Sequence, residues 1–158
     1  MTTPEGLRRD GRRALELRHL RHSLSHTTLL SQGNTTIAVK IQGPQEGKTG
    51  VSLTCPRDLF SLKQLFTSVE IPRSQIHIDV QILEQDGSVL ATAINAITLA
   101  LIHAGISMQD YIVAATASII QDTVLVDLNH SEENLDLGLL TLAKLPRSGK
   151  IVFLNVRF

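Results

Sequence analysis

The sequence predicts a single α+β or mixed α/β domain, on three observations. The chain has 158 residues, of which 42% are apolar, and this suits one compact domain with its own core. Aromatic residues make up only 3% and Trp is absent, so Ile, Leu, Val and Ala have to fill the core. Strand-like and helix-like segments both occur, in the order β-β, α, β, α and then four strands.

The first half of this order contains a hairpin, a helix and a further strand. Two strand-like runs on either side of a turn at 32–34 predict a hairpin over 27–41. Residues 45–56 are rich in Gly and predict a loop or a short strand. Apolar residues at helical spacing predict a helix over 57–67, and alternating Ile and Val predict a strand over 76–82.

The second half begins with the strongest helical pattern of the chain. Residues 89–104 are apolar on most sides and contain five alanines, and this predicts a buried helix that ends at Gly105. Four strand-like runs follow, at 111–120, 123–128, 138–143 and 150–156.

Charge is unevenly distributed, although the net charge is zero. All 15 Lys and Arg lie in residues 1–73 or 144–158, and nine of the acids lie in 74–143, so the two parts carry +9 and −9. Two interpretations stay open. The asymmetry marks surfaces that pair with partners, or it follows from acids at the turns of an apolar core.

Residues 1–26 predict an N-terminal basic arm in front of a domain over 27–158. Pro and Gly interrupt any long helix there. Four arginines crowd a short span, namely Arg8, Arg9, Arg12 and Arg13. Guanidinium groups on an unstructured arm suit bidentate contacts with phosphates or with the carboxylates of a partner. The alternative is a solvated basic terminus.

Cys55 is the only cysteine, so an internal disulfide is excluded and a reducing compartment is expected. No apolar run is long enough for a membrane span, and the N-terminus lacks the apolar core of a signal peptide. We expect a protein that is neither exported nor bound to a membrane.

Three motifs hint at ligands and fail on spacing. Residues 43–49 have three residues between the glycines, where a phosphate-binding loop needs four. Residues 127–138 start like a calcium loop but lack its central Gly and final acid. His19, His22 and His26 have no further ligands arranged around them. No metal, cofactor or catalytic residue is predicted from these motifs.

Six segments, in order, resemble the ribonuclease PH family. They are residues 4–13, 32–35, 43–46, 72–76, 81–108 and 125–134. Within the family the likeness is greatest to the eukaryotic RNA exosome ring subunit that is the counterpart of the catalytic archaeal ring protein. The resemblance implies a ribonuclease PH-like fold (ribosomal protein S5 domain 2-like), with a mixed sheet and packed helices.

The resemblance also implies that the reaction is lost. Active relatives bind phosphate through an Arg just after an Asp-Gly-Gly turn, and Leu90 falls at that position here. They also carry two aspartates six residues apart, where this chain has Glu133 and Leu139, unless a small gap brings in Asp136 instead. Phosphorolysis of RNA needs both an anion site and an acid, so we expect no enzymatic activity.

The function implied is that of a non-catalytic ring subunit in the nucleus, nucleolus and cytoplasm. Its partners would be other ribonuclease PH-like ring subunits, cap proteins and single-stranded RNA. The RNA-binding residues would be Arg8, Arg9, Arg12, Arg13 and Arg73. The alternatives are an active phosphate-dependent 3′-to-5′ exoribonuclease and a non-functional fragment.

The chain also departs from the family in length. The segment between Glu46 and Pro72 is shorter, and the family continues beyond Phe158 through helices that pack on the sheet. Part of an apolar sheet is therefore expected to be exposed.

Overall fold

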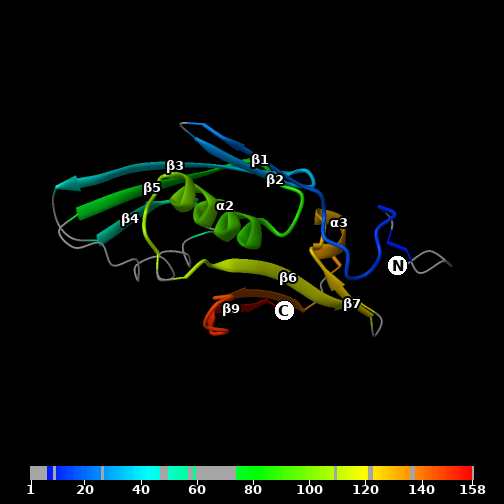
Figure 1. The fold of residues 1–158 in the computed structure, drawn as a ribbon. Coiled ribbons are helices and arrows are strands. Elements are labelled where there is room, and N and C mark those ends of the chain that lie inside the picture. Colours follow the sequence, from blue (N-terminus) through cyan, green and yellow to red (C-terminus); the bar gives the residue numbers. More distant parts are fainter. Residues whose placement is uncertain are drawn as a thin grey trace.

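The computed structural model is described here for residues 7–8, 10–25, 27–46, 50–56, 59, 74–108, 110–120, 123–135 and 138–157. The described chain forms two β-sheets with one long helix between them (Figure 1). In these residues no helix is long and apolar enough to cross a membrane.

The first sheet has five strands in the order β1-β2-β3-β5-β4. Their bounds are Leu20–Leu24 for β1, Thr28–Gln32 for β2, Thr35–Glu46 for β3, Gly50–Thr54 for β4 and Ser74–Glu84 for β5. Neighbours are antiparallel except β4 and β5, which are parallel, so this sheet is mixed as predicted. The hairpin over 27–41 and the strand over 76–82 are confirmed.

The second sheet has four antiparallel strands in the order β7-β6-β8-β9. Their bounds are Val113–Ile120 for β6, Thr123–Val126 for β7, Leu139–Lys144 for β8 and Ile151–Arg157 for β9. The four predicted strands are therefore confirmed. Within the described part of the chain these four strands pair only with each other, so they form a separate sheet.

Helix α2 (Val89–His103) fills the space between the sheets and confirms the predicted helix. Its alanines and Ile94, Ile97 and Leu101 are buried. They pack against buried Ile and Val side chains of β3 and β5. Small residues on the helix let both sheets approach it closely, so one apolar layer joins all three elements.

The structure differs from the sequence-based expectation in three places. The prediction of a free arm over 1–26 is wrong for its last part, because β1 pairs with β2 along its whole length. The helix predicted over 57–67 lies outside the described residues, except for Leu59, which is buried. A short helix that was not predicted, α3 (His130–Glu133), follows β7 and is capped by Asn129.

Candidate functional site

The turn at Asp86–Ser88 joins β5 to α2 and lies against the backbone that follows β7. Gly87 has a φ of +78°, and a Cβ placed on it would lie 2.5 Å from the Leu128 carbonyl oxygen. The Ser88 hydroxyl donates to that same carbonyl over 3.0 Å. Glycine is therefore required here both by the backbone conformation and by the close approach of the two sheets.

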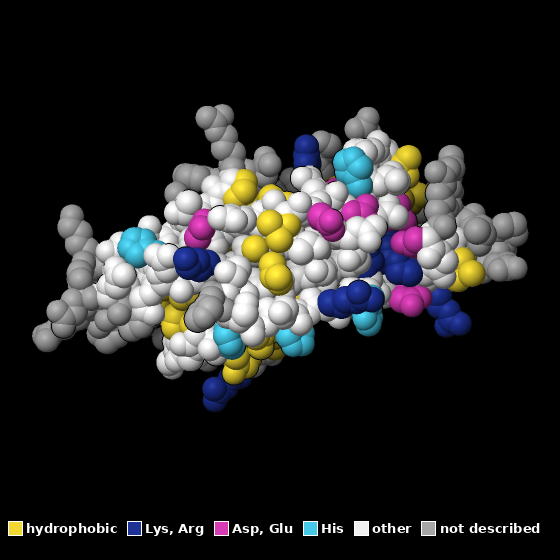
Figure 2. Space-filling view, turned by 90° about the horizontal axis from the view of Figure 1, so that it is seen from above, with side chains coloured by type: hydrophobic (Ala, Val, Ile, Leu, Met, Phe, Trp, Pro, Cys, Tyr) yellow, Lys and Arg dark blue, Asp and Glu magenta, His cyan; other side chains and the backbone are white. Residues whose placement is uncertain are grey.

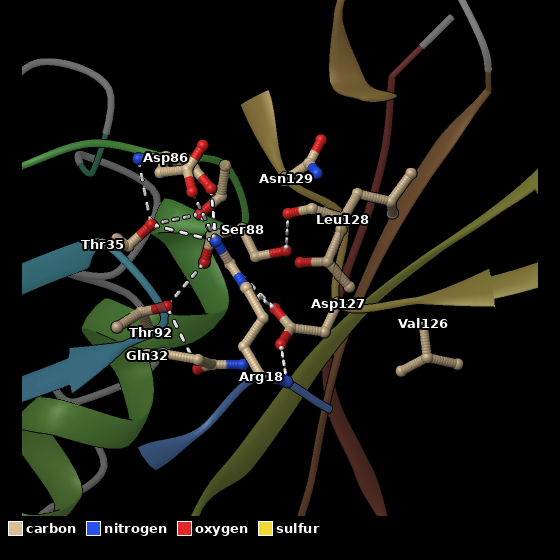
Figure 3. A network of polar contacts seen from close by, with 12 residues as sticks. Arg18, Gln32, Thr35, Asp86, Ser88, Thr92, Val126, Asp127, Leu128 and Asn129 are labelled. Atoms are coloured by element: carbon tan, nitrogen blue, oxygen red, sulfur yellow. Dashed lines mark hydrogen bonds and ion pairs between the residues drawn. The ribbon is translucent and has the colours of Figure 1, made fainter. Parts of the chain in front are cut away.

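One side of this turn carries a buried ionic network centred on Arg18 and Asp127 (Figure 3). The Arg18 Nη2 and Nε atoms donate to Asp127 Oδ1 over 2.8 and 3.1 Å, and the Arg18 backbone N–H donates to Oδ2 over 2.7 Å. The same guanidinium donates to the Gly87 carbonyl over 3.0 Å. Arg18 thus ties the N-terminal segment to both sheets.

Thr35 supports the network from β3. Its hydroxyl donates to the Gly87 carbonyl over 2.8 Å and accepts from the Asp86 backbone N–H over 3.0 Å. Burial raises the pKa of Asp127, but the hydrogen bonds and the charge of Arg18 outweigh it and hold this pKa below its ordinary value. The carboxylate is therefore ionised at neutral pH, although only 1% of its side chain is exposed.

A second ion pair extends the network toward α3. The Arg8 Nε atom donates to Glu132 Oε1 over 2.8 Å, and Nη1 donates to the Val126 carbonyl over 2.7 Å. Burial raises the pKa of Glu132, but the hydrogen bonds from Arg8 and from the Asn129 backbone N–H, together with the charge of Arg8, outweigh it and hold this pKa below its ordinary value. Glu132 also closes the cap of α3 by accepting from the Asn129 backbone N–H.

These contacts involve two residues of the predicted basic cluster, Arg8 and Arg12. The Arg8 side chain is 1% exposed and its guanidinium donates to Glu132, Val126 and Asp127, so these donors are not available to RNA. Arg12 pairs with Asp10 and donates to the Asp127 carbonyl. The Arg13 side chain is exposed. Arg9 and Arg73 lie outside the described residues.

Figure 2 shows the charged side chains at the scale of the surface. Acidic and basic side chains gather together at the end of the molecule where the N-terminal segment and α3 lie. On this face, the described acidic and basic side chains are therefore mixed at this end of the molecule.

The other side of the turn opens into a pocket of about 330 Å³ between the start of α2 and strands β8 and β9. Leu90, Glu133 and Leu139 all line it. These are the three positions that the family resemblance assigned to the phosphate-binding Arg and to the two aspartates. The structure therefore brings them together, while Asp136 lies outside the described residues.

An acidic side chain of the protein itself contacts the start of α2. Glu133 Oε1 accepts from the Ser88 backbone N–H over 2.6 Å. Ser88 is the residue before the first helical turn, and N–H groups there attract anions because the helix dipole is positive at that end. Among the described residues that line the pocket, Arg157 at the end of β9 is the one with a cationic side chain.

Ser88, Arg157 and the ionic network were not predicted from the sequence as parts of a site. Arg18 and Asp127 are 109 residues apart, and no local pattern marks them as partners. The only hint of this network in the sequence is a carboxylate followed by a turn. In the described residues no group of three or more His, Cys, Asp or Glu is placed to hold a metal ion.

Two profiles of one protein family match most of the chain. The profile "3′ exoribonuclease family, domain 1" matches residues 57–107, and "3′ exoribonuclease family, domain 2" matches residues 110–155. The chain belongs to this family, the ribonuclease PH family. The predicted family and fold are therefore confirmed, and the pocket lies where both matched segments meet.

Curated relatives extend the similarity over the whole chain. The exosome complex component RRP41 of Mus musculus is 33% identical over an alignment 196 residues long. The alignment covers 99% of this chain and 80% of that protein. The exosome complex component SKI6 of Saccharomyces cerevisiae is 32% identical and covers 98% and 79%. The chain is thus homologous to RRP41.

Solved structures agree in fold. The crystal structure of rice (Oryza sativa) Rrp46 matches with a TM-score of 0.83 at 22% identity and covers 95% of this chain and 85% of that one. A chain of the Archaeoglobus fulgidus exosome with RNA bound to the active site matches with a TM-score of 0.64 at 18% identity, over 98% and 83%. At these identities the likeness establishes the arrangement of sheets and helices.

Proposed function

We propose that this protein is a non-catalytic subunit of the RNA exosome ring. Membership is supported by its similarity to RRP41 and SKI6, both named as exosome complex components, over nearly the whole chain. The absence of activity is carried by one observation. The pocket has leucines at two of its three assigned positions, and the Glu133 carboxylate bonds to the Ser88 N–H where an anion would be expected.

Physical chemistry makes this arrangement unfavourable for phosphorolysis. Attack on RNA by inorganic phosphate needs cationic or N–H donors around the phosphate and an acid for the leaving oxygen. Leu90 offers neither charge nor a hydrogen bond to an anion. Glu133 already uses the Ser88 N–H, and its negative charge repels a second anion at contact distance.

The same proposal names the partners. The chain would contact other ribonuclease PH-like ring subunits and cap proteins, in the nucleus, nucleolus and cytoplasm. Exposed cations, among them Arg13 and Arg157, would contact the phosphates of single-stranded RNA without sequence preference. Arg8 and Arg12 would hold the fold instead.

Membership is tested by affinity purification of the tagged full chain from its native cells, followed by native mass spectrometry. We expect the other ring subunits in one complex with this chain. Depletion should cause ribosomal precursor RNA to accumulate. A chain that migrates alone, with no effect on RNA, would contradict the proposal and favour a non-functional product.

Activity is tested separately on the purified complex. The alternative function, an active phosphate-dependent exoribonuclease, predicts release of nucleoside diphosphates only when phosphate is added. We expect no release beyond that of a complex carrying Glu133→Ala in this chain. Phosphate-dependent release that this variant abolishes would assign catalysis to this subunit.

A further inference from the structure

Helix α3 lies between the N-terminal segment and the pocket. The N-terminal segment consists of the described residues 7–8 and 10–18, and Figure 1 shows it beside α3. Helix α3 has only four residues, and none of them is buried. The bond from the His130 backbone N–H to Asp86 Oδ1 is long, at 3.3 Å. A single helical turn has little stability of its own, because the first turn of a helix is costly to form. The position of α3 therefore depends on the contacts of its side chains.

Two consecutive acids fix α3 on two different sides. Glu132 Oε1 accepts from Arg8 Nε over 2.8 Å, and Glu133 Oε1 accepts from the Ser88 backbone N–H over 2.6 Å. Consecutive residues of an α-helix point about 100° apart, so one turn can direct two carboxylates to separate partners. Glu132 thus faces the N-terminal segment, and Glu133 faces the pocket.

The N-terminal segment is held to the rest of the protein by polar contacts. Arg8 Nη1 donates to the Val126 carbonyl over 2.7 Å, and the Val126 N–H donates to the Ala14 carbonyl over 3.0 Å. Two leucines of the segment stay in solvent, since Leu15 is 70% exposed and Leu17 is 51% exposed. Hydrogen bonds and ion pairs therefore carry more of the attachment than these leucines do. A segment of this kind can open while the rest of the fold stays intact.

The carboxylate that binds Arg8 also caps α3. Glu132 Oε2 accepts from the Asn129 backbone N–H over 3.0 Å, and Asn129 Oδ1 accepts from the Glu132 N–H over 2.9 Å. This capping box fixes the Glu132 side chain relative to the helix backbone. A movement of α3 away from Ser88 therefore either breaks the cap or carries Glu132 away from Arg8. In both cases the Arg8 guanidinium loses part of its bonding.

We propose that α3 couples the pocket to the N-terminal segment. Withdrawal of Glu133 from the Ser88 N–H shifts α3 and releases Arg8, and the chain up to Ala14 opens with it. Coupling between two sites is reciprocal, so release of Arg8 also loosens the bond between Glu133 and Ser88. The Arg8 guanidinium is 1% exposed when the segment is closed, and it becomes available to an external anion when the segment opens. The coupling does not depend on the catalytic state of the pocket.

Hydrogen exchange measured by NMR on the purified full chain tests the coupling from the pocket side. Glu133→Ala should raise the exchange rates of the Arg8 Nε–H and the Val126 backbone N–H about tenfold, the size of one hydrogen bond to a charged group. The Gly33 N–H, which donates to the His19 carbonyl over 2.9 Å, should keep its rate because it lies outside the coupled segment. Unchanged rates at Arg8 and Val126 would overturn the proposal.

The reverse experiment starts from the N-terminal segment. Arg8→Gln should raise the exchange rate of the Ser88 N–H about tenfold, although Arg8 bonds to Glu132 and the Ser88 N–H bonds to Glu133. Arg13→Gln, on an exposed arginine of the same segment, is the matched control and should leave this rate unchanged. If Arg8→Gln does not fold, Glu132→Gln replaces it, because it removes the charge and keeps an acceptor. An effect confined to the N-terminal segment would contradict the coupling.

A double variant distinguishes coupling from two independent effects. In Arg8→Gln with Glu133→Ala, the Val126 N–H should exchange at the rate found in Arg8→Gln alone, because the segment is already released. If the effects of the two substitutions multiply instead, the two sites act independently and the proposal is wrong.

A substitution in the core separates local opening from global destabilisation. Ile97 is 0% exposed in α2, and Ile97→Val lowers the stability of the whole fold without a change at α3. It should leave the exchange of the Arg8 Nε–H and the Val126 N–H unchanged, since we expect these groups to exchange by local opening. Equal acceleration by Ile97→Val and Glu133→Ala would show that exchange follows global unfolding, and the coupling would be ruled out.

Discussion

Two groups of side chains lie on either side of the Asp86–Ser88 turn, and they differ in their use of charge. In the ionic network, Arg18 and Asp127 are almost fully buried and bonded to each other. In the pocket, Leu90 and Leu139 occupy places where the family resemblance assigns charged residues. The network thus uses charge to join the sheets, whereas the pocket has aliphatic side chains at these two places.

This difference separates folding from chemistry within one small region. Buried ion pairs stabilise a fold only when both partners are present, so the loss of one is costly. If the pocket binds no anion, as we propose, it has no such requirement, and an aliphatic side chain there costs little stability. The comparison therefore predicts large effects on one side of the turn and small effects on the other.

The largest effect is expected for Asp127→Asn. The change keeps the shape but removes the buried countercharge of the Arg18 guanidinium, which then has only the more distant carboxylate of Asp86, at 3.7 Å, among the ion pairs of the described residues. We expect a loss of about 3 to 5 kcal/mol in the free energy of unfolding, measured by urea denaturation. Glu84→Gln, on an exposed acid of β5, should change it by less than about 0.5 kcal/mol. Equal effects would show that the network does not stabilise the fold.

The next effect is expected for Gly87→Ala. A Cβ there would lie 2.5 Å from the Leu128 oxygen and 2.6 Å from the Asn129 carbonyl carbon, both of them backbone atoms. We expect a loss of about 2 to 4 kcal/mol, from the positive φ and from overpacking.

Gly149→Ala is the matched control for this substitution. Gly149 has a similar φ of +70°, but nothing lies within 4 Å of its added Cβ. Only the backbone strain remains, and it costs about 1 to 2 kcal/mol. If both variants lose the same amount, the close approach of the two sheets at Gly87 is not a constraint.

The pH dependence of stability tests the same network without a mutation. The pKa values of Asp127 and Glu132 are lowered in the folded state from ordinary values of 3.8 and 4.5. The unfolded chain then binds these protons more readily than the folded one. The stabilisation is present above the ordinary values and is lost as the pH falls through the folded-state values.

The measurement is the urea midpoint between about pH 6 and about pH 3. We expect it to fall with pH, and to fall less steeply in Asp127→Asn, which lacks one of the two carboxyls. Identical slopes in both proteins would mean that Asp127 does not titrate with an altered pKa.

The sequence predicted the parts of the fold that rest on local patterns. Alternating residues located β5 to β9, and the alanine-rich run located α2, because both periodicities follow directly from strand and helix geometry. The division into two sheets and the short helix α3 were not predicted. Neither leaves a periodic pattern, since one depends on strand pairing and the other spans only four residues.

The site was predicted only in part, for a related reason. Resemblance to a family located Leu90, Glu133 and Leu139 by their order along the chain, and the fold gathers them in one pocket. The partners of Arg8 and Arg18 lie more than 100 residues away, so composition gave a basic arm instead of a buried network. Long-range pairing of charges is a property of the fold and leaves no mark on local composition.

The smallest effect is expected in the pocket, for Glu133. Glu133→Gln keeps an oxygen that can accept from the Ser88 N–H but removes the negative charge at the start of α2. We expect a loss of about 0.3 to 1 kcal/mol, the usual size of a charge interacting with a helix end. Glu133→Ala removes the hydrogen bond as well and should cost about 1 kcal/mol more.

The difference between these two variants separates the charge from the bond, and salt adds a third measurement. The charge contribution should shrink as salt screens it, whereas the hydrogen bond should persist. If Glu133→Gln were instead to destabilise the protein as much as Asp127→Asn, the pocket would be held by a buried charge just as the network is. Its carboxylate would then be part of the scaffold of the fold, and the contrast between the two sides of the turn would disappear.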